Sequence, residues 1–127
     1  MDKISYNFKN RTAIITGGAQ GFGLDIAKRF LNSGAKVIIW DTDSKMAEKS
    51  LKDINNSNLS SKVVDVSSYQ EVETSVKEIT KNSKIDILIN NAGITGPTAP
   101  LWEYDVDMWN KIVQINLIGT FNCCRAI

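Results

Sequence analysis

Four short apolar segments recur along the chain, with longer amphipathic segments between them. They are rich in β-branched residues and lie at residues 12–16, 36–40, 62–66 and 85–90. Each is a nearly continuous apolar run, which is typical of strands that are buried on both faces, as in a parallel sheet. The pattern therefore predicts four parallel strands.

The segments between these strands predict helices with one apolar stripe each. The stripes are Leu24, Ala27, Phe30 and Leu31, then Ala47, Leu51 and Ile54, then Val72, Val76 and Ile79. Capping residues agree, since Gly34 ends the first helix, Asp43 or Ser44 starts the second, and Ser67 or Ser68 starts the third. Strict alternation predicts the α/β class, with a doubly wound (Rossmann) parallel sheet in three layers, α/β/α. With four strands and about four helices, residues 1–127 form one incomplete domain.

Composition narrows the classes of partner. The 127 residues carry 15 Lys and Arg against 14 Asp and Glu, a formal charge of +1, and 43% are hydrophobic. This balance gives no electrostatic reason to bind nucleic acid or a membrane surface, so a small molecule is the expected partner. No apolar run reaches the length of a bilayer span, and the polar first ten residues do not resemble a signal peptide. The expected compartment is the cytoplasm.

The absence of histidine and the position of the two cysteines exclude several kinds of site. The sequence has no histidine, so neither a Ser-His-Asp triad nor most zinc sites can be built. The two cysteines, Cys123 and Cys124, are adjacent, and neighbours in a helix are poorly placed to bridge each other. They are interpreted as structural, and no metal site is expected.

A glycine-rich loop follows the first predicted strand. The segment ITGGAQGFG, residues 15–23, has four glycines where a strand must turn into a helix. Such a loop lets a diphosphate approach the backbone N–H groups at a helix start. A Walker A loop would end in Lys and Ser or Thr, but Gly23 is followed by Leu24 and Asp25. The loop therefore predicts a dinucleotide site and not an ATPase.

Small or polar residues follow the other three strands. Asp41 lies 18 residues beyond Gly23, where a dinucleotide site needs an acid for the ribose hydroxyls. Asp43 is its competitor, and we assign Asp41 to the ribose and Asp43 to a helix cap. Asp65 and Val66 lie at the end of the third strand, and NNAG, residues 90–93, lies at the end of the fourth. The carboxyl ends of parallel strands share one edge, so these residues should converge there.

Together these features resemble the short-chain dehydrogenase/reductase family over almost the whole chain. The motifs that carry the resemblance are TGGAQGFG at 16–23, Asp41, Asp65-Val66, NNAG at 90–93 and NLIGTF at 116–121. The resemblance implies an oxidoreductase that transfers a hydride between a nicotinamide cofactor and a small alcohol or carbonyl compound. It also implies that the chain is a partial NAD(P)-binding domain.

The resemblance also implies a role for each motif residue. Gly17, Gln20, Phe22 and Gly23 surround the cofactor diphosphate, with Gly21 in the same loop; Asp41 binds the ribose, Asp65 and Val66 lie by the adenine, and Asn91, Ala92 and Gly93 lie along the middle of the cofactor. Phe22 stands where the family usually has Ile or Leu and is expected to pack under the loop. The Asp41 carboxylate would repel the 2′-phosphate of NADP, so NAD is the predicted cofactor.

Asn116 interrupts the apolar stripe of the last predicted helix. The stripe consists of Trp109, Ile112, Val113, Asn116 and Thr120. A buried amide must find hydrogen-bond partners or cost roughly a few kcal/mol. One interpretation is a buried Asn bonded to nearby backbone. The resemblance implies the other, a catalytic Asn116 that helps to hold a water in the proton relay.

The proton-transfer residues of the family are not found in this sequence. The family uses Tyr and Lys in a Y-x-x-x-K motif, with a Ser that orients the substrate. None of the tyrosines, Tyr6, Tyr69 and Tyr104, has a Lys four residues later. The sequence therefore predicts that the catalytic half is absent, that these 127 residues alone are inactive, and that the reading frame continues.

Two other functions remain open from the residues alone. The first is a stand-alone nucleotide-binding module without catalysis. The second is an S-adenosylmethionine-dependent methyltransferase, which also uses a glycine-rich turn and an acid after the second strand, but which explains NNAG and Asn116 poorly. The Pro-containing loop at 94–104 is a candidate wall of the substrate pocket.

Relatives in this family commonly pair through the helix that carries Asn116. Trp109, Leu117 and Phe121, with the small Gly119, give this helix more apolar surface than one sheet face needs. The resemblance therefore implies a homodimer or a homotetramer.

Overall fold

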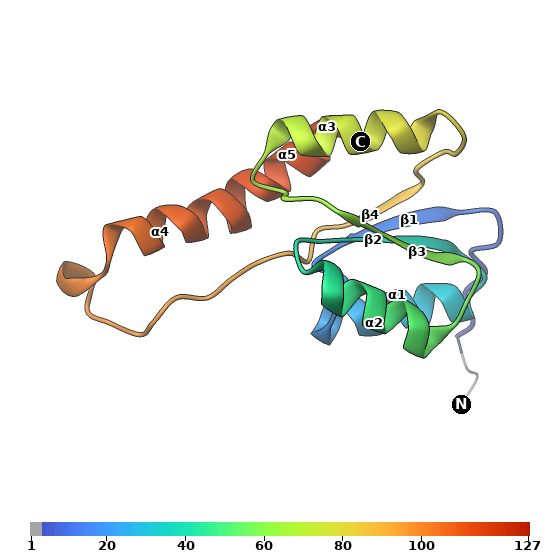
Figure 1. Cartoon of the computed structure of the whole chain (residues 1–127), viewed down its shortest axis with the longest axis horizontal. Helices are drawn as coiled ribbons and strands as arrows, with labels where there is room; N and C mark the ends of the chain where they lie inside the picture. Colours follow the sequence, from blue (N-terminus) through green and yellow to red (C-terminus); the bar gives the residue numbers. More distant parts are fainter. Residues whose placement is uncertain (1–3) are drawn as a thin grey trace.

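The four strands lie parallel in one sheet, in the order β3-β2-β1-β4 (Figure 1). The computed structural model describes residues 4–127, so only the first three residues of the polar opening segment lie outside it. The strands are β1 (Thr12–Thr16), β2 (Lys36–Asp41), β3 (Leu59–Val63) and β4 (Ile87–Ile89). The predicted α/β fold with four parallel strands is confirmed.

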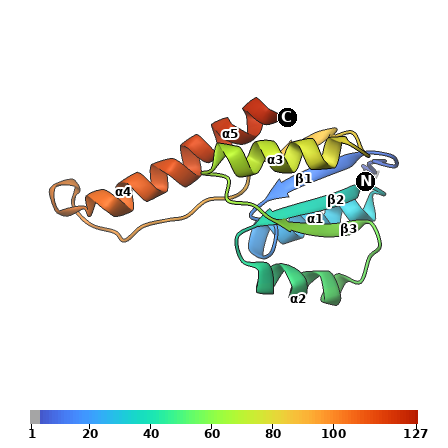
Figure 2. The same ribbon diagram turned by 45° about the horizontal axis from the view of Figure 1, so that its top comes forward.

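Helices cover both faces of the sheet, as predicted. Helices α1 (Gly21–Asn32) and α2 (Ser44–Ile54) lie against one face, and α3 (Tyr69–Thr80) and α5 (Gly119–Ala126) lie against the other (Figures 1 and 2). The predicted three-layer arrangement follows directly from the alternation of strands and helices along the chain.

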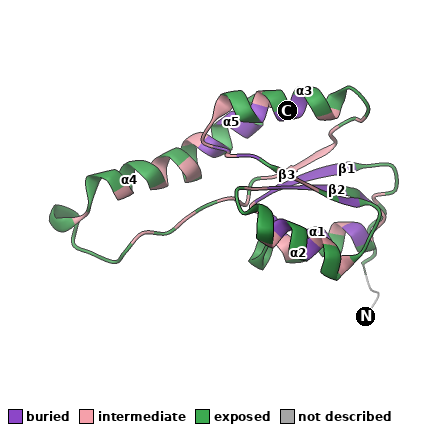
Figure 3. Cartoon of the chain, in the orientation of Figure 1, coloured by how far each residue is buried: buried purple, intermediate pink, exposed green. Residues whose placement is uncertain are grey.

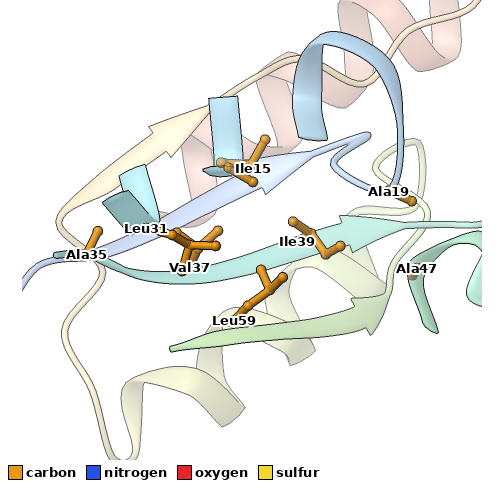
Figure 4. Packing of buried hydrophobic residues seen from close by; sticks show 9 residues of the cluster. Ile15, Ala19, Leu31, Ala35, Val37, Ile39, Ala47 and Leu59 are labelled. Carbon is orange, nitrogen blue, oxygen red and sulfur yellow. The ribbon is translucent and has the colours of Figure 1, made fainter. Parts of the chain in front are cut away.

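Alternate strand residues divide between the two faces of the sheet. Ile15 and Ile39 belong to the cluster under α1 and α2, where Figure 4 shows them on one face of the sheet. Ile14, Ile38 and Trp40 belong to the cluster under α3 and α5. Every residue of β1 is buried, which explains why the strand sequences are apolar throughout instead of alternating.

The helix ends are set by the residues that the sequence indicates. The Asp43 carboxylate accepts from Met46 N and so caps α2, while Ser68 Oγ accepts from Glu71 N at the start of α3. Gly34 follows α1 with φ of +89°, a conformation that favours glycine. Asp43, Ser68 and Gly34 thus confirm the predicted caps.

The third and fourth strands differ from their predicted bounds. The apolar pattern predicts the third at 62–66, but β3 ends at Val63 because its register pairs Leu59 with Val37 and Val63 with Asp41. Val64 and Val66 are buried under α3 without belonging to the strand. Strand β4 is shorter than predicted because it pairs only with three residues of β1.

The last third of the chain extends away from the sheet. A loop leads from β4 to the short 3₁₀ helix η1 (Leu101–Glu103), then α4 (Val106–Val113), a π-helical turn η2 (Gln114–Ile118) and α5, and the last three form one continuous helical rod. Figure 3 shows the rod buried only where α5 meets the sheet, and no residue of α4 is buried. No helix within residues 4–127 is long and apolar enough to cross a membrane.

Candidate functional site

The glycine-rich loop connects β1 to α1 through a sharp turn. Gly17 has φ of +61°, and a Cβ at Gly23 would overlap the Gly17 carbonyl oxygen. The loop and the first turn of α1 therefore pack closer than any side chain permits. No side chain caps this helix start, which leaves backbone N–H groups there for a ligand.

A hydrogen-bond clamp joins this loop to the end of β4. Asn91 Nδ2 donates to Thr16 O and to Gly17 O, both at 3.0 Å. Thr16 Oγ1 accepts from Asn91 N at 3.0 Å and from Ala92 N at 2.9 Å. The Asn91 side chain thus holds the loop in place.

The Asp41 carboxylate lies at the end of β2, facing the glycine-rich loop. Oδ2 accepts from Ala19 N at 3.0 Å, and Oδ1 accepts from Asp43 N at 3.0 Å. The side chain is only half-buried. These N–H groups fix the Asp41 carboxylate beside the glycine-rich loop while it stays accessible, whereas Asp43 is occupied as the cap of α2.

The carboxyl ends of the four strands surround one hollow of about 440 Å³, called here the carboxyl-edge hollow. The predicted cofactor residues that line it are Gly17, Gln20, Phe22, Asp41, Asp65, Val66, Asn91, Ala92 and Gly93. Gly21, Gly23 and Asn116 do not line it. The arrangement is a hollow with a carboxylate on one wall and an uncapped helix start on another.

Phe22 corrects one expectation. It is expected from the sequence to pack under the loop, but 84% of its surface is exposed at the rim of the hollow. Phe22 lies in the first turn of α1, whose inward positions are taken by Gly23 and Ala27, so its ring points outward.

Asn116 is not the buried amide that the stripe predicts. It lies in the π-helical turn and is exposed, and its side chain bonds both backbone groups of Ile94. Oδ1 accepts from Ile94 N and Nδ2 donates to Ile94 O, each at 2.9 Å. The expected backbone partners are therefore present, but they belong to the loop after β4. Asn116 fixes the start of that loop.

The buried amide of the rod is Asn122, which the sequence pattern does not single out. It is 3% exposed, and Nδ2 donates to Val66 O at 2.9 Å. The stripe that faces the sheet runs through Ile115, Gly119 and Cys123. The π-helical turn changes the phase of the helix, so the 3.6-residue pattern that includes Trp109 does not continue into α5.

A family model described as short chain dehydrogenase matches residues 11–127. The chain belongs to the short chain dehydrogenase family. Among its relatives is the 2-dehydro-3-deoxy-L-rhamnonate dehydrogenase (NAD(+)) of Sphingomonas sp. (strain SKA58), 35% identical over 100% of this chain and 51% of that protein. The 3-oxoacyl-(acyl-carrier-protein) reductase FabG of Chlamydia muridarum is 36% identical over 93% of this chain and 49% of that protein.

Solved structures agree with this assignment. The chain superimposes with a TM-score of 0.87 on the 3-ketoacyl-(acyl-carrier-protein) reductase of Brucella melitensis complexed with NADH, at 33% identity over 94% of this chain and 49% of that one. A short-chain dehydrogenase structure from Novosphingobium aromaticivorans gives 0.89 at 30% identity, over 94% and 45%. This short chain dehydrogenase sequence thus spans about half the length of the relatives it matches.

Two further polar residues support the hollow, and the sequence pattern did not predict this role for them. Ser50 is 5% exposed, and its Oγ donates to Ala19 O at 2.7 Å, which ties α2 to the glycine-rich loop. Thr16 forms the clamp with Asn91 described above. The available signal for Ser50 was a small polar residue three positions after Ala47 on an apolar stripe.

The two cysteines lie in different environments. Cys123 is buried, and burial raises the pKa of its thiol to about 11, whereas Cys124 is exposed. A neutral buried thiol is a packing group and a weak nucleophile. Within residues 4–127 no cluster of His, Cys, Asp and Glu is placed to hold a metal ion.

Proposed function

We propose that this chain is the cofactor-binding part of an NAD-dependent oxidoreductase that acts on a small alcohol or carbonyl compound. Membership of the short chain dehydrogenase family supports the reaction type. The observation that carries the choice of NAD is Asp41, fixed by Ala19 N and directed at the glycine-rich loop. Bound NAD would supply the hydride acceptor.

The residues of the carboxyl-edge hollow fit the parts of a dinucleotide. The uncapped start of α1 suits the diphosphate, because its free N–H groups and the helix dipole favour an anion. Gly21 faces open space there, since a Cβ at this position would have no atom within 4 Å. On this proposal Gly17 and Gly23 keep the loop tight, Asp65 and Val66 lie by the adenine, and Asn91 to Gly93 lie along the middle of the cofactor.

Asp41 also provides the basis for preferring NAD over NADP. A 2′-phosphate on the adenosine ribose would meet the Asp41 carboxylate, and two such charges about 4 Å apart near a surface repel by roughly 4 kcal/mol before screening. Asp43 lines the same hollow and would add to this repulsion. The binding of NAD should therefore be stronger than that of NADP.

The test compares two carboxylates, one that lines the hollow and one that does not. Asp41→Ala should weaken NAD binding and narrow the preference over NADP. Asp53→Ala is the control, because it removes an exposed carboxylate of α2 that does not line the hollow and leaves Asp41 in place. Calorimetric titrations of both variants with both cofactors measure the difference. Equal or tighter binding of NADP by the unmutated protein would contradict the proposal.

Catalysis on this proposal needs a Tyr and a Lys from outside these 127 residues. Asn116 is proposed to help hold the water of the proton relay, which its exposed position beside Ile94 permits. Expression of the complete reading frame and assay of hydride transfer separate this proposal from a stand-alone nucleotide-binding module. If the product of the complete reading frame binds NAD but neither oxidises an alcohol with NAD nor reduces a carbonyl compound with NADH, the module would be favoured.

We also propose that the protein is a homodimer or a homotetramer. Trp109, Leu117 and Phe121 lie on the helical rod with 53%, 64% and 57% of their surfaces exposed, which supports an apolar contact. Gly119, in contrast, packs inward against Val66 and does not belong to this surface. A monomer in sedimentation at micromolar concentration would contradict the proposal.

A further inference from the structure

A second hollow lies at the opposite edge of the sheet, where the four strands begin. Its volume is about 510 Å³, and it is called here the amino-edge hollow. Its lining includes four cationic side chains, Lys9, Arg11, Lys36 and Lys84, and one carboxylate, Asp86. These cations come from the segment before β1, from β2 and from the segment before β4, so the fold gathers them from three parts of the chain.

The single carboxylate is already neutralised. Arg11 Nη1 donates to Asp86 Oδ1 at 2.7 Å, and Thr12 N donates to Oδ2 at 2.9 Å. These bonds hold the pKa of Asp86 below its ordinary value, so it stays charged and paired with Arg11. Lys84 also contributes to this shift, but a single carboxylate balances only one of the four cationic side chains.

The lysines have no acidic partner of their own. Among the ion pairs formed by residues 4–127, none includes Lys9, Lys36 or Lys84. Lys36 Nζ instead lies 3.5 Å from Ser83 Oγ, a neutral group. By contrast, Lys62 and Lys77 on the same molecule each pair with a Glu. The amino-edge hollow thus concentrates uncompensated positive charge in a concave surface.

We propose that the amino-edge hollow binds a small anion of the phosphate type that carries two or more negative charges. Three ammonium groups favour a multivalent anion over a single carboxylate. None of the residues that line the hollow within the described chain is aromatic, so nothing there would stack on a base or sugar ring. Recognition therefore rests on the charged phosphate groups themselves.

This site is separate from the carboxyl-edge hollow. No residue lines both, and Lys36 and Asp41 are the first and last residues of β2. The proposal does not depend on the proposed function, because it uses none of the cofactor residues. Its failure would leave the NAD proposal intact, and the reverse is also true.

The test is calorimetric titration of the protein with pyrophosphate at low ionic strength, with NAD present to compete for the glycine-rich loop. The double variant Lys36→Gln/Lys84→Gln removes two of the three unpaired charges and should weaken binding by about tenfold. The control Lys49→Gln/Lys111→Gln removes the same charge from two exposed lysines that line neither hollow, and should leave binding within about twofold.

Several outcomes would overturn the proposal. Absence of pyrophosphate binding is one, and equal binding by the two double variants is another, since the anion would then occupy the glycine-rich loop or the surface in general. A poly-glutamate peptide that binds in a lysine-dependent way where pyrophosphate does not would point to an acidic protein partner instead. Thermal unfolding of each variant without ligand checks that the fold is intact.

Discussion

Strands β1 and β2 are packed much more completely than strand β4 and helix α4. Around β1 and β2, the strand residues Ala13, Ile14, Ile15, Val37 and Ile39 have 0% exposure, with helices on both faces. Strand β4 is half-buried along its whole length, and α4 buries no residue at all. The difference shows that β1 and β2 form a well-packed core within this chain, whereas β4 and α4 do not.

The carboxyl-edge hollow crosses the boundary between these two regions. The glycine-rich loop and Asp41 belong to the well-packed side, while Asn91 and Gly93 follow the poorly packed strand. The clamp between Thr16 and Asn91 adds to the pairing of β1 with β4 and joins the two regions at the hollow. We therefore expect the part of the hollow near Asp41 to be rigid and the part beyond Gly93 to depend on contacts made by the rod.

The largest effect should come from the packed core. Ile39→Ala removes a fully buried side chain between the sheet and α1, and it should lower the free energy of unfolding by about 3 kcal/mol. Val106→Ala, at an exposed side chain at the start of α4, should cost about 0.5 kcal/mol or less. Urea unfolding of both variants measures the contrast. Similar costs would mean that α4 is covered in solution.

A second contrast uses two glycines. Gly23→Ala places a Cβ against the Gly17 carbonyl, a backbone group that cannot move aside. It should lower the free energy of unfolding by about 2 kcal/mol and remove most of the cofactor binding. A Cβ at Gly96 would meet the Tyr104 hydroxyl and Ile112 Cδ1, the far ends of two side chains and not backbone. Gly96→Ala should therefore be tolerated at about 0.5 kcal/mol. The same urea titrations apply, and a tolerated Gly23→Ala would show that the loop relaxes.

The sequence was most informative where one local interaction decides the structure. The Asp43 cap, the positive φ of Gly34 and the burial of β1 all follow from residue type and spacing. The glycine-rich loop and Asp41 were also located correctly in space, because parallel strands must end at one edge. Their role in cofactor binding stays a prediction.

The sequence failed where the structure depends on register or helix phase. Residues 62–66 have the composition of a strand, but pairing with β2 ends at Val63. Asn116 is exposed and Asn122 is buried because the helical rod meets the sheet only at α5, beyond the π-helical turn, and nothing in the residue pattern marks that turn. Phe22 faces outward because Gly23 and Ala27 occupy the side of α1 that faces the sheet.

Replacing Asn116 and Asn122 by alanine, one at a time, compares the exposed part of the helical rod with the part that packs on the sheet. Asn122→Ala leaves the Val66 carbonyl without its donor in a buried site and should cost about 1–2 kcal/mol. Asn116→Ala removes two bonds to Ile94 in an exposed site and should cost about 0.5 kcal/mol, with faster hydrogen exchange of the Ile94 amide. A larger cost for Asn116 would reverse the assignment of the buried amide.

The smallest effect concerns the beginning of β4, where Asp86 joins it to β1. Bonds from Thr12 N and then from Arg11 lower the pKa of Asp86, so its stabilising contribution is present above the ordinary pKa of about 4 and is lost as pH falls through the lowered value. Asp86→Asn keeps the shape but removes the charge, so its stability should be below that of the unmutated protein at neutral pH. The two should converge as pH falls through the lowered pKa of Asp86. Urea midpoints between these limits measure the convergence, and Asp53→Asn, at an exposed carboxylate on α2, is the control that should show little difference.

A gap between Asp86→Asn and the unmutated protein that stayed constant down to the lowest pH would show that the loss is steric and that Arg11 does not stabilise β4 through charge.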